Sequence, residues 1–415
     1  MSYINELGKR AKAAEMAIAD ASTARKNKAL EEIAIALEEN TDLIIKENAV
    51  DLANAKENNI PIAMQDRLAL DESRIKGIAD AVRELISLDD PIGSIDSGIV
   101  RPNGLRINKM RVPLGVIGII YESRPNVTVD AATLCLKSGN VSILRGGKEA
   151  FNSNKCLMNI MRSAVAKAGF PSDIISLVED TSRDVATELM RSSDYLDVLI
   201  PRGGTGLIKA VMNNATVPVI ETGAGNCHIF IDETADLQMG IDIIDNAKTS
   251  RPSVCNAAET LLVHKGIAKA ILPDIKVRLD KHNVEIRGCE RTRAILGEGI
   301  ILATNDDYAE EFHDYILAIK VVDDIDEAIN HIRMYGTKHS EAIVTNDYNN
   351  SVKFQMQVDA AAVYVNASIR YTDGGEFGLG AEIGISTQKL HARGPMGLRE
   401  LTTVKFLVNG EGQIR

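Results

Sequence analysis

The spacing of apolar residues predicts that the chain begins with helices. Ile33, Leu37 and Ile44 recur at intervals that place side chains on one face of an α-helix. A further helical pattern opens at Asp71 and is interrupted by the acidic residues before Pro91. The start of the chain, up to that proline, is therefore expected to be helical.

A hairpin and then an α/β alternation follow. Short alternating stretches around Asn103-Gly104 predict a β-hairpin. Beyond it, short apolar strands alternate with helices, and this alternation predicts parallel βαβ units in a doubly wound sheet. The predicted strands are 115–120, 141–144, 174–178, 197–200 and 218–220, and the predicted helices are 127–137, 153–168, 182–191 and 205–213.

A second α/β series begins near Ile229, so a cofactor and a nucleophile could lie on different series. The alternating segment Thr402–Val408 predicts a terminal strand without an obvious partner nearby, and pairing across a subunit interface is one way to satisfy it. In the second α/β series, the strands are expected at 259–263, 317–322, 341–344 and 361–365, and the helices at 236–249, 324–334 and 347–357.

Composition excludes several classes of protein. The net charge of −11 argues against a nucleic-acid or anionic-membrane partner, and the absence of Trp argues against a stacking platform for bases. No apolar run is long enough to span a membrane and no signal peptide is recognised, so we expect a cytoplasmic protein. The five cysteines contain no CxxC pair, which suits a reducing compartment and indicates no metal site.

Cys255 is the strongest candidate for chemistry. It stands in a loop rich in polar residues, just before the strand-like run 261–263. A cysteine thiolate is a good nucleophile toward carbonyl carbon, and the Asn126 side chain could donate a hydrogen bond to the developing oxyanion. The alternatives are a buried structural cysteine and a helix N-cap, respectively.

A glycine-containing turn is a second candidate. Gly203, Gly204 and Thr205 follow a predicted strand and open a predicted helix. Their backbone N–H groups could approach a phosphate or a nicotinamide closely. The segment is not a GxGxxG fingerprint, so a plain turn is the alternative.

Seven blocks of sequence, taken together, resemble the aldehyde dehydrogenase superfamily over essentially the whole chain. Within the superfamily, the chain resembles the branch that reduces an acyl phosphate. That resemblance implies NADPH-dependent reduction of L-glutamyl 5-phosphate to L-glutamate 5-semialdehyde with release of phosphate, through a Cys255 thioester, in proline biosynthesis. The blocks are 123–132, 136–140, 144–150, 201–204, 218–228, 252–260 and 391–395.

The resemblance also implies an α/β fold in three parts and a homo-oligomer. Pathway logic adds glutamate 5-kinase as a partner, because an acyl phosphate is labile. The expected parts are a Rossmann-like NADPH-binding domain (1–106, 126–228 and 361–382), an α/β catalytic domain (229–360) and a small β oligomerisation element (107–125 and 383–415).

Roles for charged residues follow from the same resemblance. Arg145 and Lys148 lie in the turn that holds the adenosine ribose, where Lys148 would attract the 2′-phosphate of NADPH, and solvent-exposed charge is the alternative. Glu311 is a candidate contact for the nicotinamide ribose. Arg124 and Arg202 are candidates for the acyl phosphate or the α-carboxylate of the substrate.

Glu221 leaves the choice of reaction open. Hydrolytic aldehyde dehydrogenases keep a general-base glutamate at this place, but the block Glu-Thr-Gly-Ala-Gly differs from theirs. The alternatives are therefore a hydrolytic dehydrogenase of a small semialdehyde and, less in keeping with Cys255 and Asn126, a non-catalytic cofactor-binding protein.

Overall fold

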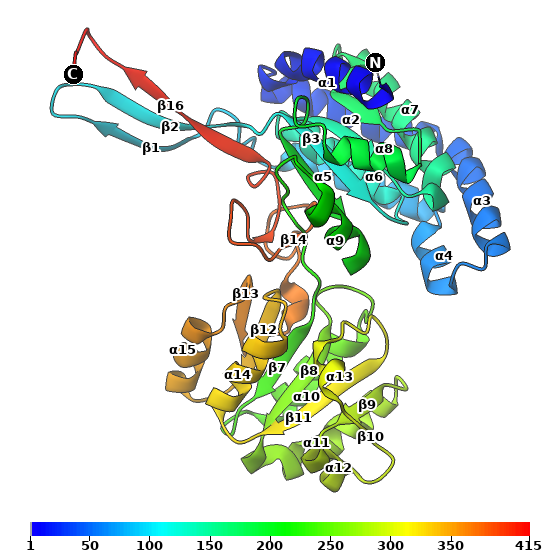
Figure 1. Ribbon diagram of the computed structural model, residues 1–415, viewed down its shortest axis with the longest axis vertical. Helices are drawn as coiled ribbons and strands as arrows, with labels where there is room; N and C mark the ends of the chain where they lie inside the picture. Colours follow the sequence, from blue (N-terminus) through cyan, green and yellow to red (C-terminus); the bar gives the residue numbers. More distant parts are fainter. Residues whose placement is uncertain (1) are drawn as a thin grey trace. The chain divides into compact units, whose positions relative to one another are not determined.

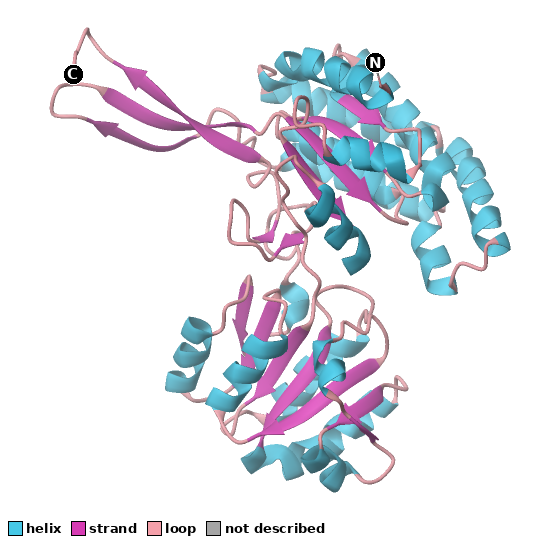
Figure 2. Cartoon of the chain, viewed as in Figure 1, coloured by secondary structure: helices cyan, strands magenta, loops and turns pink. Residues whose placement is uncertain are grey.

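A computed structural model describes residues 2–415, and the chain divides into two compact units. Unit 1 contains the chain up to Thr222 together with 378–384 and 396–415, and unit 2 contains 223–377 and 385–395. Figures 1 and 2 show the elements of each. Within the described residues, no helix is long and apolar enough to cross a membrane.

Unit 1 begins with five helices, as the apolar spacing predicted. The side chains of Ser2, Ser22 and Asp71 accept backbone N–H groups at three of the helix starts, which explains where these helices begin. Ile33 and Leu37 are fully buried in the core. The helices are α1 (Tyr3–Ala19), α2 (Thr23–Glu39), α3 (Thr41–Glu57), α4 (Ile62–Leu68) and α5 (Glu72–Ser87).

A four-stranded parallel sheet forms the centre of unit 1, in the order β5-β4-β3-β6. Its strands end at one edge, which brings the segments after β3, β4 and β6 together. The predicted strand 218–220 is reduced to a single bridge between Leu199 and Val219, since Pro218 has no N–H to donate. The elements are β3 (Val116–Tyr121), α6 (Asn126–Lys137), β4 (Val141–Arg145), η1 (Lys148–Ala150), α7 (Phe151–Lys167), η2 (Ser172–Ile174), β5 (Ile175–Leu177), α8 (Arg183–Met190), β6 (Val198–Arg202) and α9 (Thr205–Asn214).

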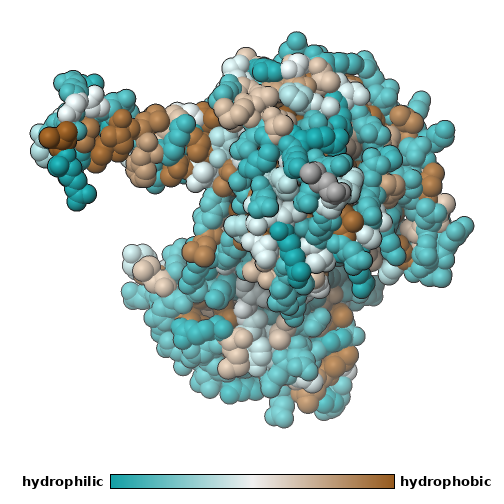
Figure 3. All heavy atoms as spheres, turned by 45° about the horizontal axis from the view of Figure 1, so that its top comes forward, coloured by the Kyte–Doolittle hydropathy of each residue, from teal (hydrophilic) through white to brown (hydrophobic). Residues whose placement is uncertain are grey.

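An antiparallel sheet of β1 (Ile95–Val100), β2 (Arg106–Pro113) and β16 (Thr402–Asn409) completes unit 1. The predicted hairpin is confirmed as β1 and β2. The terminal strand has no partner nearby in sequence, as expected, but it is satisfied within the chain, because β16 pairs with β2 along its whole length. The sheet is largely exposed and carries apolar side chains (Figure 3).

Unit 2 is built on a seven-stranded parallel sheet, in the order β10-β9-β11-β8-β7-β12-β13. Apolar clusters cover both faces of this sheet, and for this reason its strands are continuous apolar runs in the sequence. The elements are β7 (Cys227–Ile231), α10 (Leu237–Thr249), β8 (Ala258–His264), α11 (Lys265–Asp280), β9 (Glu285–Gly288), α12 (Glu290–Leu296), β10 (Ile301–Leu302), α13 (Asn305–Ala309), β11 (Ile316–Val322), α14 (Ile325–Tyr335), β12 (Ser340–Val344), α15 (Tyr348–Gln357), β13 (Ala362–Val365), η3 (Ile369–Tyr371), β14 (Ile385–Ser386) and β15 (Gly394–Pro395).

The units and sheets divide three of the expected ranges differently. The segment 361–382 was expected in the NADPH-binding domain, but β13 pairs with β12 and extends the sheet of unit 2. The range 107–125 was expected in the oligomerisation element, but its second half forms β3, the buried inner strand beside β4 and β6. The tail 383–415 does not form one element, since 385–395 belongs to unit 2.

Candidate active site

Cys255 lies in the turn between α10 and β8, in the loop before a strand that the sequence predicted, and it is partly exposed. Cys135, Cys156 and Cys227 are buried, and Cys289 is partly exposed. Burial raises the pKa of the Cys135 thiol well above its ordinary value and that of Cys156 to about 11. These two thiols stay protonated near neutral pH and are unsuited to nucleophilic attack.

The backbone of the Cys255 turn is held on two sides. The Asn256 side chain donates hydrogen bonds to the carbonyl oxygens of Arg370 (3.1 Å) and Thr372 (3.0 Å). The Cys227 thiol donates to the carbonyl oxygen of Cys255 at 3.2 Å. Gly225 packs against that same carbonyl so closely that a Cβ there would collide with it. The nucleophile is therefore presented by a fixed turn.

A buried ion pair joins the two ends of this turn. The Lys248 ammonium at the end of α10 lies 2.6 Å from the Glu259 carboxylate in β8, and both side chains are fully buried. Glu259 also accepts the backbone N–H of His313 at 3.3 Å. Burial lowers the pKa of Lys248 and raises that of Glu259 to about 7, while the pairing opposes both shifts.

Arg370, which the sequence reasoning missed, lies near Cys255, and Arg251 lies near Arg370. The Arg370 Nε donates to the Ser250 hydroxyl at 3.1 Å. Burial and the neighbouring Arg251 lower the pKa of Arg370, whereas the Cys255 thiolate raises it, because opposite charges attract. The same attraction stabilises the thiolate. Arg370 is 115 residues away in sequence (370 − 255), so no local pattern indicated it.

Asn126 is the first residue of α6 in unit 1. Its side chain does not cap the helix but donates through Nδ2 to the Asp130 carboxylate at 2.9 Å. This contact fixes the amide plane and identifies the nitrogen as the donor side. The geometry suits a hydrogen-bond donor, as the oxyanion role requires.

Asp130 was also missed, although an Asn and an Asp four residues apart on a predicted helix were a usable signal. Burial raises the pKa of its carboxyl group to about 6, although the Asn126 amide and the Arg202 guanidinium favour the charged form. Arg202 ends β6 and packs against Gly384.

Arg145 is the last residue of β4 and Lys148 opens the short helix η1 after it, and the two differ in exposure. The Arg145 guanidinium donates to the Thr181 carbonyl oxygen at 2.6 Å, and burial lowers its pKa. Arg145 thus anchors the loop after β5. Lys148 is exposed and, within residues 2–415, forms no ion pair, because the adjacent Glu149 accepts hydrogen bonds from Ser123 instead.

Gly203, Gly204 and Thr205 join β6 to α9, which confirms the predicted strand-turn-helix arrangement. A Cβ at Gly203 would collide with the Glu122 carboxylate, and Gly204 donates its N–H to that carboxylate at 2.9 Å. No side chain caps α9. Exposed Lys148 and the uncapped start of α9 lie at the same edge of a parallel sheet, which fits the phosphates of a dinucleotide.

Glu311 has both carboxylate oxygens in protein contacts. One accepts the Gly225 N–H at 2.8 Å, and the other lies 3.3 Å from the His313 ring. Burial opposes ionisation, but these contacts lower the pKa of Glu311. Glu311 therefore supports the segment that packs against the Cys255 turn, and a ribose contact stays a prediction.

The predicted site residues fall in both units. Cys255 and Glu311 belong to unit 2, and Asn126, Arg124, Arg145, Lys148, Arg202 and the glycine turn belong to unit 1. Glu221 is partly buried near the end of unit 1, in a segment without regular structure.

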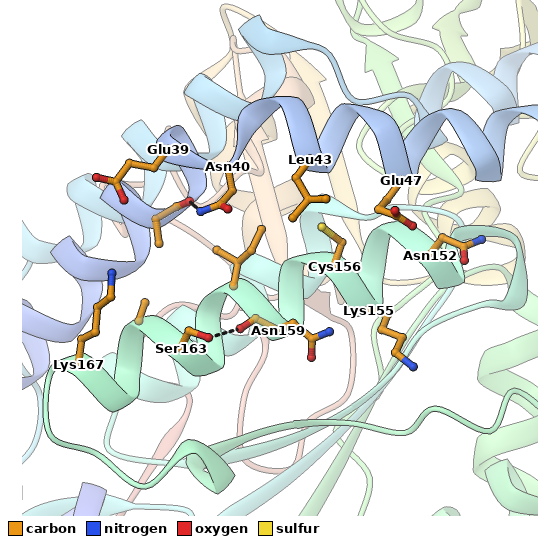
Figure 4. A pocket seen from close by; sticks show the side chains of 13 residues that line it. Glu39, Asn40, Leu43, Glu47, Asn152, Lys155, Cys156, Asn159, Ser163 and Lys167 are labelled. Carbon is orange, nitrogen blue, oxygen red and sulfur yellow. Dashed lines mark hydrogen bonds between the residues drawn. The ribbon is translucent and has the colours of Figure 1, made fainter.

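A cavity of about 470 Å³ in unit 1 is separate from these residues. It lies between α3 and α7 and is lined by charged, amide and apolar side chains, with Cys156 at its wall (Figure 4). None of the predicted site residues lines it. The cavity therefore does not mark the candidate active site.

Known proteins are similar to this chain in sequence and in fold. The sequence model of the aldehyde dehydrogenase family matches residues 2–292. The chain belongs to that family. It is 61% identical to a gamma-glutamyl phosphate reductase of Clostridium perfringens, over 99% of this chain and 100% of the relative, and 56% identical to one of Listeria innocua over the full length of both. Within the family, the chain belongs to the gamma-glutamyl phosphate reductases.

Solved structures agree. The crystal structure of gamma-glutamyl phosphate reductase from Thermotoga maritima matches with a TM-score of 0.97 and 52% identity, covering all of both chains. An acetylating aldehyde dehydrogenase from Geobacillus thermoglucosidasius matches with a TM-score of 0.71 at 18% identity, over 99% of this chain and 97% of that one, and this likeness concerns the fold alone.

Proposed function

We propose that the chain reduces L-glutamyl 5-phosphate to L-glutamate 5-semialdehyde and releases phosphate, a step of proline biosynthesis. The observation that carries this proposal is the partly exposed Cys255 on its fixed turn, in a chain that is 61% identical to a reductase of that substrate over its full length. The hydrolytic alternative is not favoured by this similarity.

The chemistry divides into two steps at the Cys255 sulfur. The thiolate attacks C5 of the substrate, the bond to the phosphate oxygen breaks, and a thioester forms. A bound nicotinamide cofactor supplies the hydride that reduces the thioester carbon. The tetrahedral oxyanion then re-forms a carbonyl, the carbon–sulfur bond breaks, and the aldehyde and the thiolate are restored. Asn126 is the proposed donor to the oxyanion in both steps.

We do not assign to Glu221 the role of a base that activates water. A reductase must protect its thioester from hydrolysis, and the sequence around Glu221 departs from that of the hydrolytic enzymes. A role in taking the proton of the Cys255 thiol is compatible with reduction.

NADPH is the proposed form of the cofactor. Lys148 supports this choice, because an exposed cation without an ion pair after β4 suits a 2′-phosphate. Gly203, Gly204, Thr205 and Arg145 complete the proposed cofactor surface.

We expect Lys148→Ala to weaken NADPH binding by about 10-fold or more and NADH binding little, as measured by quenching of cofactor fluorescence. Equal weakening of both cofactors would refute the 2′-phosphate assignment.

Several arginines are candidates for the anionic groups of the substrate. Arg124 and Arg202 in unit 1 were proposed from the sequence. Arg370 in unit 2 joins them because it lies near Cys255, and Arg251 joins them because it lies near Arg370; neither forms a direct ion pair within the described part of the chain. Two neighbouring guanidinium groups suit a phosphate.

A homo-oligomer is proposed from the three-stranded sheet. Phe406 and Val408 are more than half exposed on β16, and Val100 on β1 is 71% exposed. Exposed apolar strands are typical of surfaces that pair or pack with another chain.

Hand-over of substrate from glutamate 5-kinase stays a proposal from the lability of the acyl phosphate.

The test is phosphate dependence of the reverse reaction. L-glutamate 5-semialdehyde and NADP⁺ are mixed with the protein, with and without inorganic phosphate, and formation of the reduced cofactor is followed. We expect sustained turnover only with phosphate, and none with Cys255→Ser. Sustained turnover without phosphate would mean that water resolves the thioester and would establish the hydrolytic reaction instead.

A further inference from the structure

The Asp130 carboxylate stands beside the amide that is proposed to stabilise the oxyanion. Its Oδ2 accepts the Asn126 Nδ2–H at 2.9 Å, one helical turn along α6. Asp130 is partly exposed, so a ligand can reach it. Because the amide and the carboxylate are in direct contact, a ligand oxygen bound to Asn126 and a ligand ammonium bound to Asp130, each at an ordinary hydrogen-bond length, can lie roughly 5–6 Å apart. A glutamate side chain spans a distance of this order between its C5 oxygen and its α-amino group.

A carboxylate at this place is electrostatically costly without a cation. Negative charge develops on the substrate oxygen near Asn126, and a nearby ionised carboxylate repels it. Burial raises the pKa of Asp130 to about 6, which shows that the surroundings only partly compensate its charge. Arg202 attracts Asp130 from a distance, but the two form no direct ion pair within residues 2–415. A cationic ligand group that contacts the Asp130 oxygen beside Asn126 would supply a direct counter-charge.

We propose that Asp130 binds the α-ammonium group of the amino-acid substrate and thereby makes the enzyme specific for an α-amino aldehyde and its acyl phosphate. The inference rests on the proposed function and adds the residue that recognises the amino group. The substrate ammonium neutralises Asp130 as it binds, so only an amino substrate removes the repulsion from the oxyanion site. Arg202, the neighbouring cation, suits the α-carboxylate of the same head group.

The experiment compares three aldehydes in the phosphate-dependent oxidation with NADP⁺. L-glutamate 5-semialdehyde carries the ammonium and the carboxylate, 5-oxopentanoate carries only the carboxylate, and pentanal carries neither. The variant is Asp130→Asn, which keeps an oxygen that can accept the Asn126 N–H. Asp194→Asn, at an exposed aspartate of the same unit, is the matched control.

We expect the wild type to prefer glutamate semialdehyde to 5-oxopentanoate by about 100-fold in kcat/KM, and Asp130→Asn to bring this ratio close to one, mainly through KM. Asp194→Asn keeps the wild-type ratio. Arg202→Gln is expected to weaken both carboxylate-bearing aldehydes relative to pentanal. Asp130→Ala, checked for folding by its thermal melt, is expected to lose the same discrimination.

Two other results would overturn the inference. Equal losses for the three aldehydes in Asp130→Asn would mean that Asp130 only positions Asn126. An unchanged ratio of kcat/KM between glutamate semialdehyde and 5-oxopentanoate in Asp130→Asn would mean that another residue binds the amino group. Failure of the proposed function is distinguishable, since the wild type would then oxidise none of the aldehydes in a phosphate-dependent way.

Discussion

The charged side chains near the Cys255 turn are of two kinds, those that are neutralised by an ion pair and those that are not. Lys248 and Glu259 neutralise each other in a fully buried pair, whereas Arg251 and Arg370 form no direct ion pair within the described residues. The first arrangement supports structure and the second suits ligand binding. The loop context of Cys255 left a structural cysteine as an equal alternative, and the nucleophile was favoured only by the resemblance of the whole chain to a family. The arginine beside Cys255 and the paired Lys248 could not be predicted, because contacts across the fold leave no local pattern.

The Lys248–Glu259 pair gives a prediction for stability. Glu259→Gln leaves a buried ammonium without a counter-charge, so we expect the free energy of unfolding to fall by about 3 kcal/mol. Replacing both residues, as Lys248→Met with Glu259→Leu, is expected to cost much less. Urea unfolding measures both. Asp280→Asn, which breaks the exposed pair with Lys276 (2.6 Å), is the control and should cost about 0.5 kcal/mol or less. Similar losses for the buried and exposed pairs would contradict this account.

Asp130 gives a prediction for pH dependence. Its pKa of about 6 in the folded protein lies above its ordinary value, so the folded state holds the proton more tightly than the unfolded state. The contribution of Asp130 to stability therefore declines as the pH rises from about 4 to about 6. At pH 8 we expect Asp130→Asn to raise the free energy of unfolding by about 1 kcal/mol, after allowance for partial exposure, as measured by denaturant unfolding. At pH 5 the increase in the free energy of unfolding should be smaller. A loss of stability at pH 8 would contradict the assignment.

At the scale of elements, strands and helices with clear periodicity were predictable and the irregular middle of unit 2 was not. The strands β3, β4, β6, β8 and β12 fall within one or two residues of their predicted bounds. The segment from α11 to α13 received no prediction. Pro273 lies inside α11 although proline usually ends helices, and β10 is short and exposed, so neither shows a typical pattern.

Gly225 gives the prediction at this scale. The start of β7 approaches the Cys255 turn so closely that a Cβ at Gly225 would collide with backbone, which cannot rotate away. We expect Gly225→Ala to lower the free energy of unfolding by about 1–3 kcal/mol and to reduce kcat strongly, because the nucleophile moves. Gly299→Ala, where nothing lies within 4 Å, is the control in the same unit. Full activity of Gly225→Ala would show that the turn is not fixed by this contact.

For the whole molecule, the sequence predicted two α/β series but not which distant segments complete them. The partner of β16 is β2, at least 289 residues away in sequence (402 − 113), and β13 joins the sheet of unit 2 rather than that of unit 1. An alternating pattern shows that a strand has one buried or apolar face, but it does not name the strand beside it. Such pairings are set by packing over the whole fold.

The exposed sheet predicts how the oligomer can be broken. Phe406→Glu places a charge on the apolar face of β16, so we expect the assembly measured by light scattering after gel filtration to dissociate. Lys405→Glu changes the neighbouring position, whose side chain points to the opposite face, and should leave the assembly intact. An unchanged mass for Phe406→Glu would place the interface elsewhere.

The most direct test of the central claim is the mass of the protein after one turnover without phosphate. The protein is mixed with excess L-glutamate 5-semialdehyde and NADP⁺, and intact and peptide masses are recorded. We predict one equivalent of reduced cofactor per active site and a glutamyl thioester on Cys255, which disappears when phosphate is added. Continuous formation of reduced cofactor without phosphate, or an adduct on another residue, would contradict the account.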